Sequence, residues 1–412
     1  MNPLLYAKSR DVTTWRAVED FAAAYRQALL DRAASGQGGS TETVFSETSA
    51  SIKAVIATHR KLLKRLELLT KKVAMAAPSV DLKELTFAFY SDLYQHFGIF
   101  RSAPAFYQLS MTFLIRASAT IVSRATEQLE PGAGDHSELA LIAVGPAGRS
   151  EYSPFCRLQL LLVHGEATGS QLQSIDRFCQ ALHAGFEAAG LAVDPAITPR
   201  NAVWRGTMTE WQDRCKDEGR HPLVDAGIIN LYRLVDQYPL YSADRLAREF
   251  KQTCSTALSG SHPALANLIE QMGALSNGLS LMGRLKLERS GNDRGLFRLI
   301  DHGLQPLSAA LSALAIVKNI DAVGNCERIH DLLRRSELDV EQAERMLATW
   351  HTLHGLLLLR EQSFQTVEHT KRAACLNPDE LTAEQLQSLK EALESVAVIQ
   401  RHVDIIFSGM GE

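Results

Sequence analysis

The sequence predicts an α+β protein that is mostly α-helical, with a central α/β domain between two helical bundles. Two short apolar runs at residues 140–144 and 158–163, separated by a glycine turn, are typical of buried strands. On both sides of these runs, apolar residues recur at helical spacing over long stretches. These patterns predict an N-terminal helical domain over residues 1–130, an α/β domain over 131–255 and a C-terminal helical domain over 256–412.

The N-terminal region predicts a bundle of helices. A first helix is expected over residues 14–33, and the sequence SGQGGSTE at 35–42 is typical of a flexible linker. Residues 49–74 place apolar side chains on one stripe with lysines and arginines opposite, which predicts a long amphipathic helix. Two further helices are expected from Leu82 and from Ser102, the last of them running to about Leu129.

The α/β region opens after a turn-rich joint at residues 131–137. Its two apolar runs predict neighbouring strands, and the sequence between them carries the glycine turn. A helix over residues 171–189 and a short strand at 191–194 are expected to follow.

From residue 261 onward the pattern is helical again. The apolar helix around residues 304–314 is too short and too serine-interrupted to span a membrane. A helix begins near Asn325, and another runs over residues 340–364. The last helix has the clearest start, because Thr382 followed by Gln385 is a capping box.

Composition indicates a soluble, cytoplasmic protein. The net charge of −4 over 412 residues gives no reason to expect nucleic acid or a membrane as a partner. The N-terminus lacks a signal-peptide pattern. The six cysteines include no C-x-x-C pair, which fits reduced thiols and argues against a disulfide framework or a zinc site.

The glycine turn is the candidate binding site. Gly145 and Gly148 follow the first predicted strand, and a short helix is expected to start at or near Pro146. Glycines let a backbone approach a ligand closely, and a helix start offers free N–H groups to phosphates. Residues 157 and 159 should point the same way from the second strand, because residues two apart share a face.

The sequence of this turn resembles the nucleotidyltransferases of the polymerase-beta superfold, and in particular the protein-PII uridylyltransferase branch and related bacterial signalling proteins. Those proteins carry Gly-Ser-x-Gly-Arg-x-Glu and then Asp-x-Asp. This chain matches the pattern at four positions and departs from it at three. The matching residues are Gly145, Gly148, Arg149 and Glu151, and the departures are Pro146 for the serine and Arg157 and Gln159 for the two aspartates.

Weaker matches extend the resemblance along the chain. The family has an Asn-x-x-Trp-Arg run and a further tryptophan, which correspond here to Asn201, Trp204, Arg205 and Trp211. Where relatives read Asp-x-Arg, this chain has Leu231 and Arg233, so a third carboxylate is missing as well. Residues 303–407 resemble the helical C-terminal domain of these proteins, whereas their usual cyclic-nucleotide-binding and CBS sensor domains are not visible.

The resemblance implies a transferase scaffold with a degenerate active site. Nucleotidyl transfer needs magnesium ions held by carboxylates, and the exchange to Arg157 and Gln159 removes two negative charges and adds a positive one. We therefore expect a noncatalytic signalling protein without a cofactor, which binds a partner protein or a nucleotide. Two alternatives stay open: an active, magnesium-dependent transferase that recruits Glu151 or Asp225, and a structural helical adaptor that forms homodimers.

Several residues have both a functional and a structural interpretation. Arg149 and Glu151 either bind phosphate or tie the turn to the sheet, and Arg157 either binds phosphate or faces water. Three other groups are interpreted as structural: the spacing of His351 and His354 allows a metal pair but lacks a third ligand, Cys156 is expected to be a buried strand-edge thiol, and Asp176 and Glu187 to lie on a solvated helix face.

Overall fold

The computed structural model describes most of the chain and confirms the predicted fold class, α+β and mostly helical. The residues it describes are 41–127, 139–167, 169–216, 234–242, 244–259, 270, 272–280, 282–364 and 374–408. The predicted helix at 14–33, the joint at 131–137, and residues Asp225, Leu231 and Arg233 lie outside these ranges.

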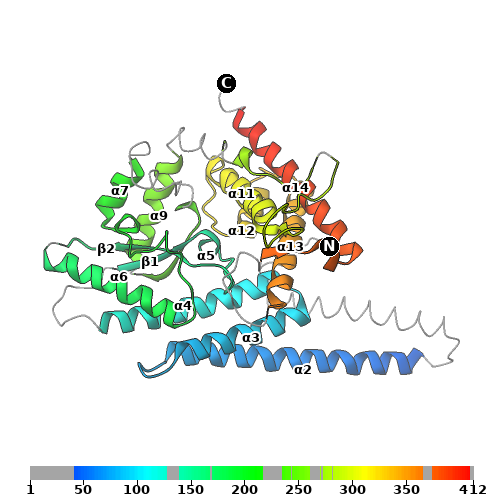
Figure 1. Cartoon of the computed structure of the whole chain (residues 1–412), viewed down its shortest axis with the longest axis horizontal. Helices are drawn as coiled ribbons and strands as arrows, with labels where there is room; N and C mark the ends of the chain where they lie inside the picture. The colour runs from blue at the N-terminus through cyan, green and yellow to red at the C-terminus, as the bar shows by residue number, and fades with distance from the viewer. Residues whose placement is uncertain are drawn as a thin grey trace.

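Three N-terminal helices form a layer under the rest of the molecule (Figure 1). They are α2 (Thr41–Ala74), α3 (Leu82–Phe100) and α4 (Ala103–Glu127). The helix predicted from residue 49 starts at Thr41, eight residues earlier, and includes the last two residues of the expected linker. Asp81 caps α3 by accepting a hydrogen bond from the Lys83 backbone N–H at 2.7 Å. Phe89 of α3 stacks on Phe113 of α4 with ring centroids 4.0 Å apart, which joins the two helices in the core.

A mixed sheet with the strand order β3-β2-β1-β4 forms the α/β domain. The strands are β1 (Leu139–Val144), β2 (Gln159–His164), β3 (Arg205–Gly206) and β4 (Gln237–Ser242). β1 pairs antiparallel with both β2 and β4, and Ile142 lies opposite Leu161. The two apolar runs of the sequence are therefore neighbouring central strands. The expected strand at 191–194 is reduced to a bridge between Val193 and Leu158.

Helices cover both faces of this sheet. The face with Leu141 and Leu160 packs into the core that contains α4 and α6 (Ser170–Ala188). The opposite face, with Ile142 and Leu161, packs on α7 (Met208–Lys216) and α9 (Asp244–Ser259). Figure 1 shows α4 and α6 below the strands and α7 and α9 above them. Because both faces are buried, β1 is apolar at every position.

Strand β4 was not predicted, and its sequence explains why. It contains Pro239, which cannot donate a ladder hydrogen bond. The proline is tolerated because β4 lies at the end of the described sheet, and its pairing with β1 shifts register between Leu141 and Ile142.

The C-terminal domain is a helical bundle, as predicted. A π-helical turn at Ile300–Leu304 leads into α11 (Gln305–Val317), which is followed by α12 (Asn325–Arg334), α13 (Val340–Gln362) and α14 (Ala383–Ser408). The capping box of α14 is confirmed, because the Gln385 backbone N–H donates to Thr382 Oγ1 at 3.1 Å and the Thr382 backbone N–H donates to Gln385 Oε1 at 2.9 Å.

The expectation of helix from residue 261 onward is wrong for residues 276–280 and 282–298. This stretch contains turns and a short strand, β5 (Phe297–Arg298), which pairs with β6 (Cys375–Leu376). Glycines with positive φ recur along it, at Gly278, Gly283, Gly291 and Gly295, and they break any helical pattern.

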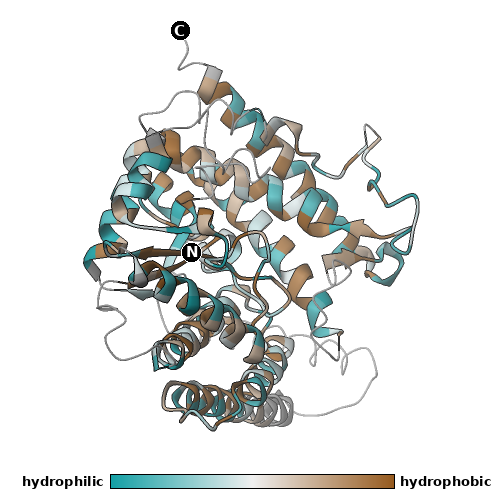
Figure 2. Ribbon diagram, turned by 60° about the vertical axis from the view of Figure 1, so that its left-hand side comes forward, coloured by the Kyte–Doolittle hydropathy of each residue, from teal (hydrophilic) through white to brown (hydrophobic). Residues whose placement is uncertain are grey.

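Among the described residues, the helical stretch Ile300–Val317 is apolar enough to cross a membrane by length and composition, and 61% of it is buried inside the protein. Figure 2 shows apolar residues along the strands and along the inner faces of the helices. The burial of this stretch is that of a core helix of the C-terminal bundle.

Candidate functional site

The glycine turn forms a single helical turn, α5 (Gly145–Gly148), directly after β1. Pro146 lies in its first turn, as predicted. Gly145 has a φ of +64°, which favours glycine. Gly148 is required for a different reason: a Cβ at this residue would lie 2.0 Å from the carbonyl oxygen of Asp236. The turn is therefore packed directly against the segment that leads into β4.

The side chain of Gln159 covers the start of this turn. A Cβ on Gly145 would lie 2.5 Å from Gln159 Oε1, so the amide group sits against the glycine backbone. Gln159 Nε2 also donates to Asp194 Oδ2 at 3.3 Å. The group in contact with the turn is therefore a neutral amide.

Arg157 lies at the surface before β2 begins. Its side chain is exposed, and Nη1 donates to the Val193 carbonyl at 3.1 Å. Arg157 and Gln159 thus both reach the segment at Val193 and Asp194, in agreement with the prediction that they point the same way.

Arg149 and Glu151 form a buried ion pair immediately after the turn. Arg149 Nε lies 2.9 Å from Glu151 Oε2, and Arg149 Nη1 lies 2.6 Å from Asp236 Oδ2. The Arg149 side chain is 13% exposed and that of Glu151 is 4% exposed. The two motif residues tie the turn to the start of β4, as the structural interpretation proposed. Phosphate binding by either residue stays a prediction.

The same carboxylates reach into the C-terminal bundle. Glu151 Oε1 accepts hydrogen bonds from Asn325 Nδ2 at 2.9 Å and from Trp350 Nε1 at 2.8 Å. Asp236 Oδ1 lies 2.8 Å from Nη2 of Arg328, whose side chain is fully buried. We call this set of contacts the interdomain network. Its members are Arg149, Glu151, Asp236, Ser312, Asn325, Arg328, Trp350 and His354.

The charges of the network balance, with two guanidinium groups facing two carboxylates. Burial alone would raise the pKa of Glu151, but the Arg149 guanidinium and the hydrogen bond from Trp350 hold this pKa below its usual value. Burial lowers the pKa of His354 to about 4, so this histidine is neutral near pH 7. Its Nδ1 lies 2.7 Å from the Tyr107 hydroxyl.

Sequence reasoning missed Asp236, Asn325 and Arg328 as parts of this network. Asn325 and Arg328 are three residues apart on α12 and therefore share a face. This spacing was the only feature of the sequence that could have suggested that the two residues act together. A fully buried arginine needs a carboxylate partner, but Asp236 lies 92 residues away in sequence and no local pattern points to it.

The other candidates are structural. His354 belongs to the network, and among the described residues no group of three or more His, Cys, Asp or Glu side chains could hold a metal ion. Burial raises the pKa of Cys156 to about 11, which makes a reactive thiolate unfavourable. Asp176 pairs with Arg205, and Glu187 accepts a hydrogen bond from the Val193 backbone N–H at 2.7 Å, so neither is only a solvated surface residue.

The residues that match the Asn-x-x-Trp-Arg run and the further tryptophan also stabilise the fold. Trp204 and Trp211 are fully buried, and Trp211 Nε1 donates to the Leu162 carbonyl of β2 at 3.2 Å. Asn201 caps a short 3₁₀ turn by accepting from the Val203 backbone N–H at 3.2 Å.

Glu361 is a buried carboxyl group outside the interdomain network. It is 2% exposed on α13 and accepts hydrogen bonds from the Tyr94 hydroxyl at 2.7 Å and the Ser153 hydroxyl at 2.8 Å. Burial raises its pKa to about 7 although both hydrogen bonds act in the opposite direction. Glu361 therefore joins α13 to α3 and to the loop that follows the glycine turn.

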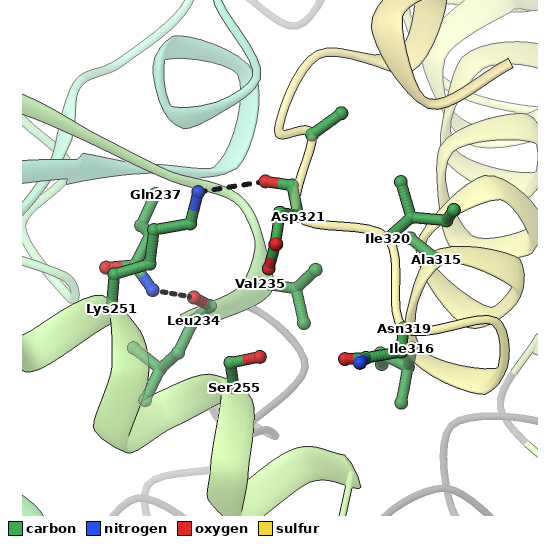
Figure 3. Close-up of a pocket in the computed structure, with 11 residues that line it drawn as sticks. Leu234, Val235, Gln237, Lys251, Ser255, Ala315, Ile316, Asn319, Ile320 and Asp321 are labelled. Atoms are coloured by element: carbon green, nitrogen blue, oxygen red, sulfur yellow. Dashed lines mark hydrogen bonds between the residues drawn. The ribbon is translucent and has the colours of Figure 1, made fainter. Parts of the chain in front are cut away.

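A small cavity lies beside the network, between α9 and the end of α11. It encloses about 40 Å³ and is lined in part by Val235, Lys251 and Asp321. In Figure 3, Lys251 Nζ donates to the Asp321 carbonyl (2.8 Å), and on one side of the cavity Gln237 Nε2 donates to the Leu234 carbonyl (2.7 Å). The volume suits a few water molecules, whereas small-molecule sites span roughly 300–1,000 Å³.

The structure is a small mixed-sheet α/β domain joined to a helical domain. Residues 101–223 match the family described as putative nucleotidyltransferase DUF294, and residues 262–407 match the putative nucleotidyltransferase substrate binding domain. The two matches support placing the chain in a nucleotidyltransferase family. No curated protein matches it. The first match starts at residue 101 and includes α4, which packs against α6 and β4.

Proposed function

We propose that this chain is a catalytically inactive relative of the nucleotidyltransferases, of the protein-PII uridylyltransferase type, that acts as a cytoplasmic signalling protein. In this role it binds a partner protein or a nucleotide without transferring a nucleotidyl group. The observation that carries the proposal is the contact of the Gln159 amide with Gly145, at a position where related proteins hold a metal ion through an aspartate.

The residues at this site do not fit magnesium. Mg²⁺ takes hard oxygen ligands in octahedral geometry, chiefly carboxylates and water. Arg157 brings a positive charge, and both oxygens of Glu151 are engaged by Arg149, Asn325 and Trp350. Asp194 is the nearby carboxylate, and its Oδ1 and Oδ2 accept hydrogen bonds from the Ala196 backbone and from Gln159.

The active alternative would need carboxylates from elsewhere. Using Glu151 would break a buried ion pair, which costs about 3–5 kcal/mol when one charge loses its partner. Asp225, the other candidate, lies outside the described residues.

Radiolabelled UTP or ATP, supplied with Mg²⁺ or Mn²⁺ and candidate acceptor proteins, is expected to give no labelled product above a no-enzyme blank. An authentic uridylyltransferase with its own acceptor serves as the positive control. The variant that carries Arg157→Asp and Gln159→Asp restores the Asp-x-Asp pattern and tests whether the scaffold can still hold metal. Metal-dependent labelling by the unmodified chain would overturn the proposal.

A phosphate ligand, if one binds at the turn, should be anchored by Arg157 without magnesium. A charge-assisted hydrogen bond contributes about 1.5–3 kcal/mol, so Arg157→Asp should weaken nucleotide binding by about tenfold or more. Calorimetry with ATP, UTP and cyclic nucleotides in EDTA measures this, with the exposed Arg284→Asp as a matched control. Binding that requires Mg²⁺, or that Arg157→Asp leaves unchanged, would exclude Arg157 as the anchor. No binding of any nucleotide would favour the protein partner.

A further inference from the structure

The interdomain network connects the two regions that match separate families. Arg149 and Glu151 belong to the first matched region, and Asn325, Arg328 and Trp350 belong to the second. The contacts between the glycine turn and the helical bundle are shielded from solvent, because the side chains of Glu151 and Arg328 are both buried. Glu151 contacts the C-terminal helices directly, and Arg149 reaches them through Asp236, which pairs with Arg328.

The backbone of the turn is part of the same arrangement. Gly148 approaches the Asp236 backbone so closely that a Cβ would lie 2.0 Å from its carbonyl oxygen, and Arg149 binds the Asp236 carboxylate from the next position. Asp236 in turn contacts Arg328 and the Ser312 hydroxyl at 3.2 Å. A shift of α5 cannot occur without a change at α11 and α12.

We propose that Gly148, Arg149 and Glu151 serve here as positioning residues that fix the C-terminal helical domain on the glycine turn through Asp236 and Arg328. This role does not depend on whether the chain transfers nucleotides, and it accounts for the retention of Arg149 and Glu151 beside a lost Asp-x-Asp pair. It also makes the helical domain responsive to anything that moves the turn.

The physical basis is the cost of separating buried charges. Rotating the helical domain away from the sheet would leave Arg328 and Asp236 without their partners, and an uncompensated buried charge is strongly unfavourable. Arg328 also donates to the Ala322 carbonyl at 3.0 Å and to Ser312 at 3.0 Å, so its guanidinium is held in place by its own domain. In the observed arrangement, Arg328 and Asp236 both have charged and hydrogen-bonding partners.

A double-mutant cycle with hydrogen exchange tests this coupling on the full chain. Arg328→Met should lower Tm by about 5 °C or more and speed amide exchange on both sides of the network, at residues 139–151 and at 305–334. Asp236→Asn should have a similar effect, and the double variant should lose less than the sum of the two. The matched control is Arg345→Met, which removes a surface ion pair on α13 and should change Tm by about 1 °C or less.

Trp350→Phe provides a milder variant in case Arg328→Met fails to fold. It removes the indole N–H that donates to Glu151 at 2.8 Å and keeps an aromatic ring in the core. Faster exchange at residues 139–151 is again expected. Faster exchange confined to the C-terminal helices, or additive effects in the cycle, would show that these residues stabilise their own domain only and would overturn the proposal.

Discussion

Replacing Gly148 with alanine is expected to lower the free energy of unfolding by about 3 kcal/mol or more. The new Cβ would lie 2.0 Å from the Asp236 carbonyl oxygen, 2.7 Å from its carbon and 3.0 Å from the Ala143 carbonyl oxygen. All three atoms belong to the backbone of β1 or of the segment before β4, so no side-chain rotation can relieve the contact. Urea unfolding followed by circular dichroism measures the loss.

Gly355 on α13 is the matched control for this substitution. A Cβ at Gly355 meets nothing within 4 Å, and alanine is favoured over glycine inside a helix. Gly355→Ala should therefore raise stability by about 0.5–1 kcal/mol. A Gly148→Ala variant as stable as the unmodified chain would mean that the turn is not packed against Asp236 as described.

Glu361 should make the protein less stable as the pH rises from about 4.5 to above 7. Its pKa is about 7 in the folded chain and near 4.5 when unfolded, so the folded state holds this proton more tightly. The stabilisation is complete below the unfolded pKa and is lost as the pH rises through the folded pKa. Its upper limit is roughly 3 kcal/mol, since one pKa unit corresponds to about 1.4 kcal/mol.

Buried histidines, among them His96 and His354, act in the opposite direction and must be separated from this effect. Burial lowers the pKa values of His96 and His354 to about 4, so their contribution to stability is lost as the pH falls from about 6.5 to 4. Comparing the unmodified chain with the Glu361→Gln variant cancels the contribution of the histidines, because the two proteins contain the same histidines. The stability of the glutamine variant relative to the unmodified chain should increase between pH 5 and pH 8.

Urea unfolding at pH 5, 6, 7 and 8 provides the measurement. Glu380→Gln, at an exposed carboxylate that pairs with Arg360, is the control and should follow the profile of the unmodified chain. A difference between Glu361→Gln and the unmodified chain that stays constant over this range would show that Glu361 does not titrate there.

Local sequence patterns predicted the strands, helix starts and caps that depend on interactions between residues close in sequence. The apolar runs around Ile142 and Leu161 became the central strands, and Pro146 starts α5 because its fixed φ and missing N–H suit the first turn of a helix. Thr382 and Gln385 cap α14 within four residues of each other. Strand β4 was not predicted because Pro239 is unfavourable in a strand. The proline is acceptable only because β4 lies at the end of the described sheet.

The sequence by itself determined the fold class and the position of the glycine turn. Only the tertiary structure decided how Arg149 and Glu151 are used. Arg149 pairs with Asp236, and Glu151 accepts hydrogen bonds from Asn325 and Trp350. These partners are distant in sequence, and the contacts form only when the sheet and the C-terminal bundle meet. Spacing rules describe neighbours along one helix or strand, whereas the pairing of charges across two domains depends on how those domains pack.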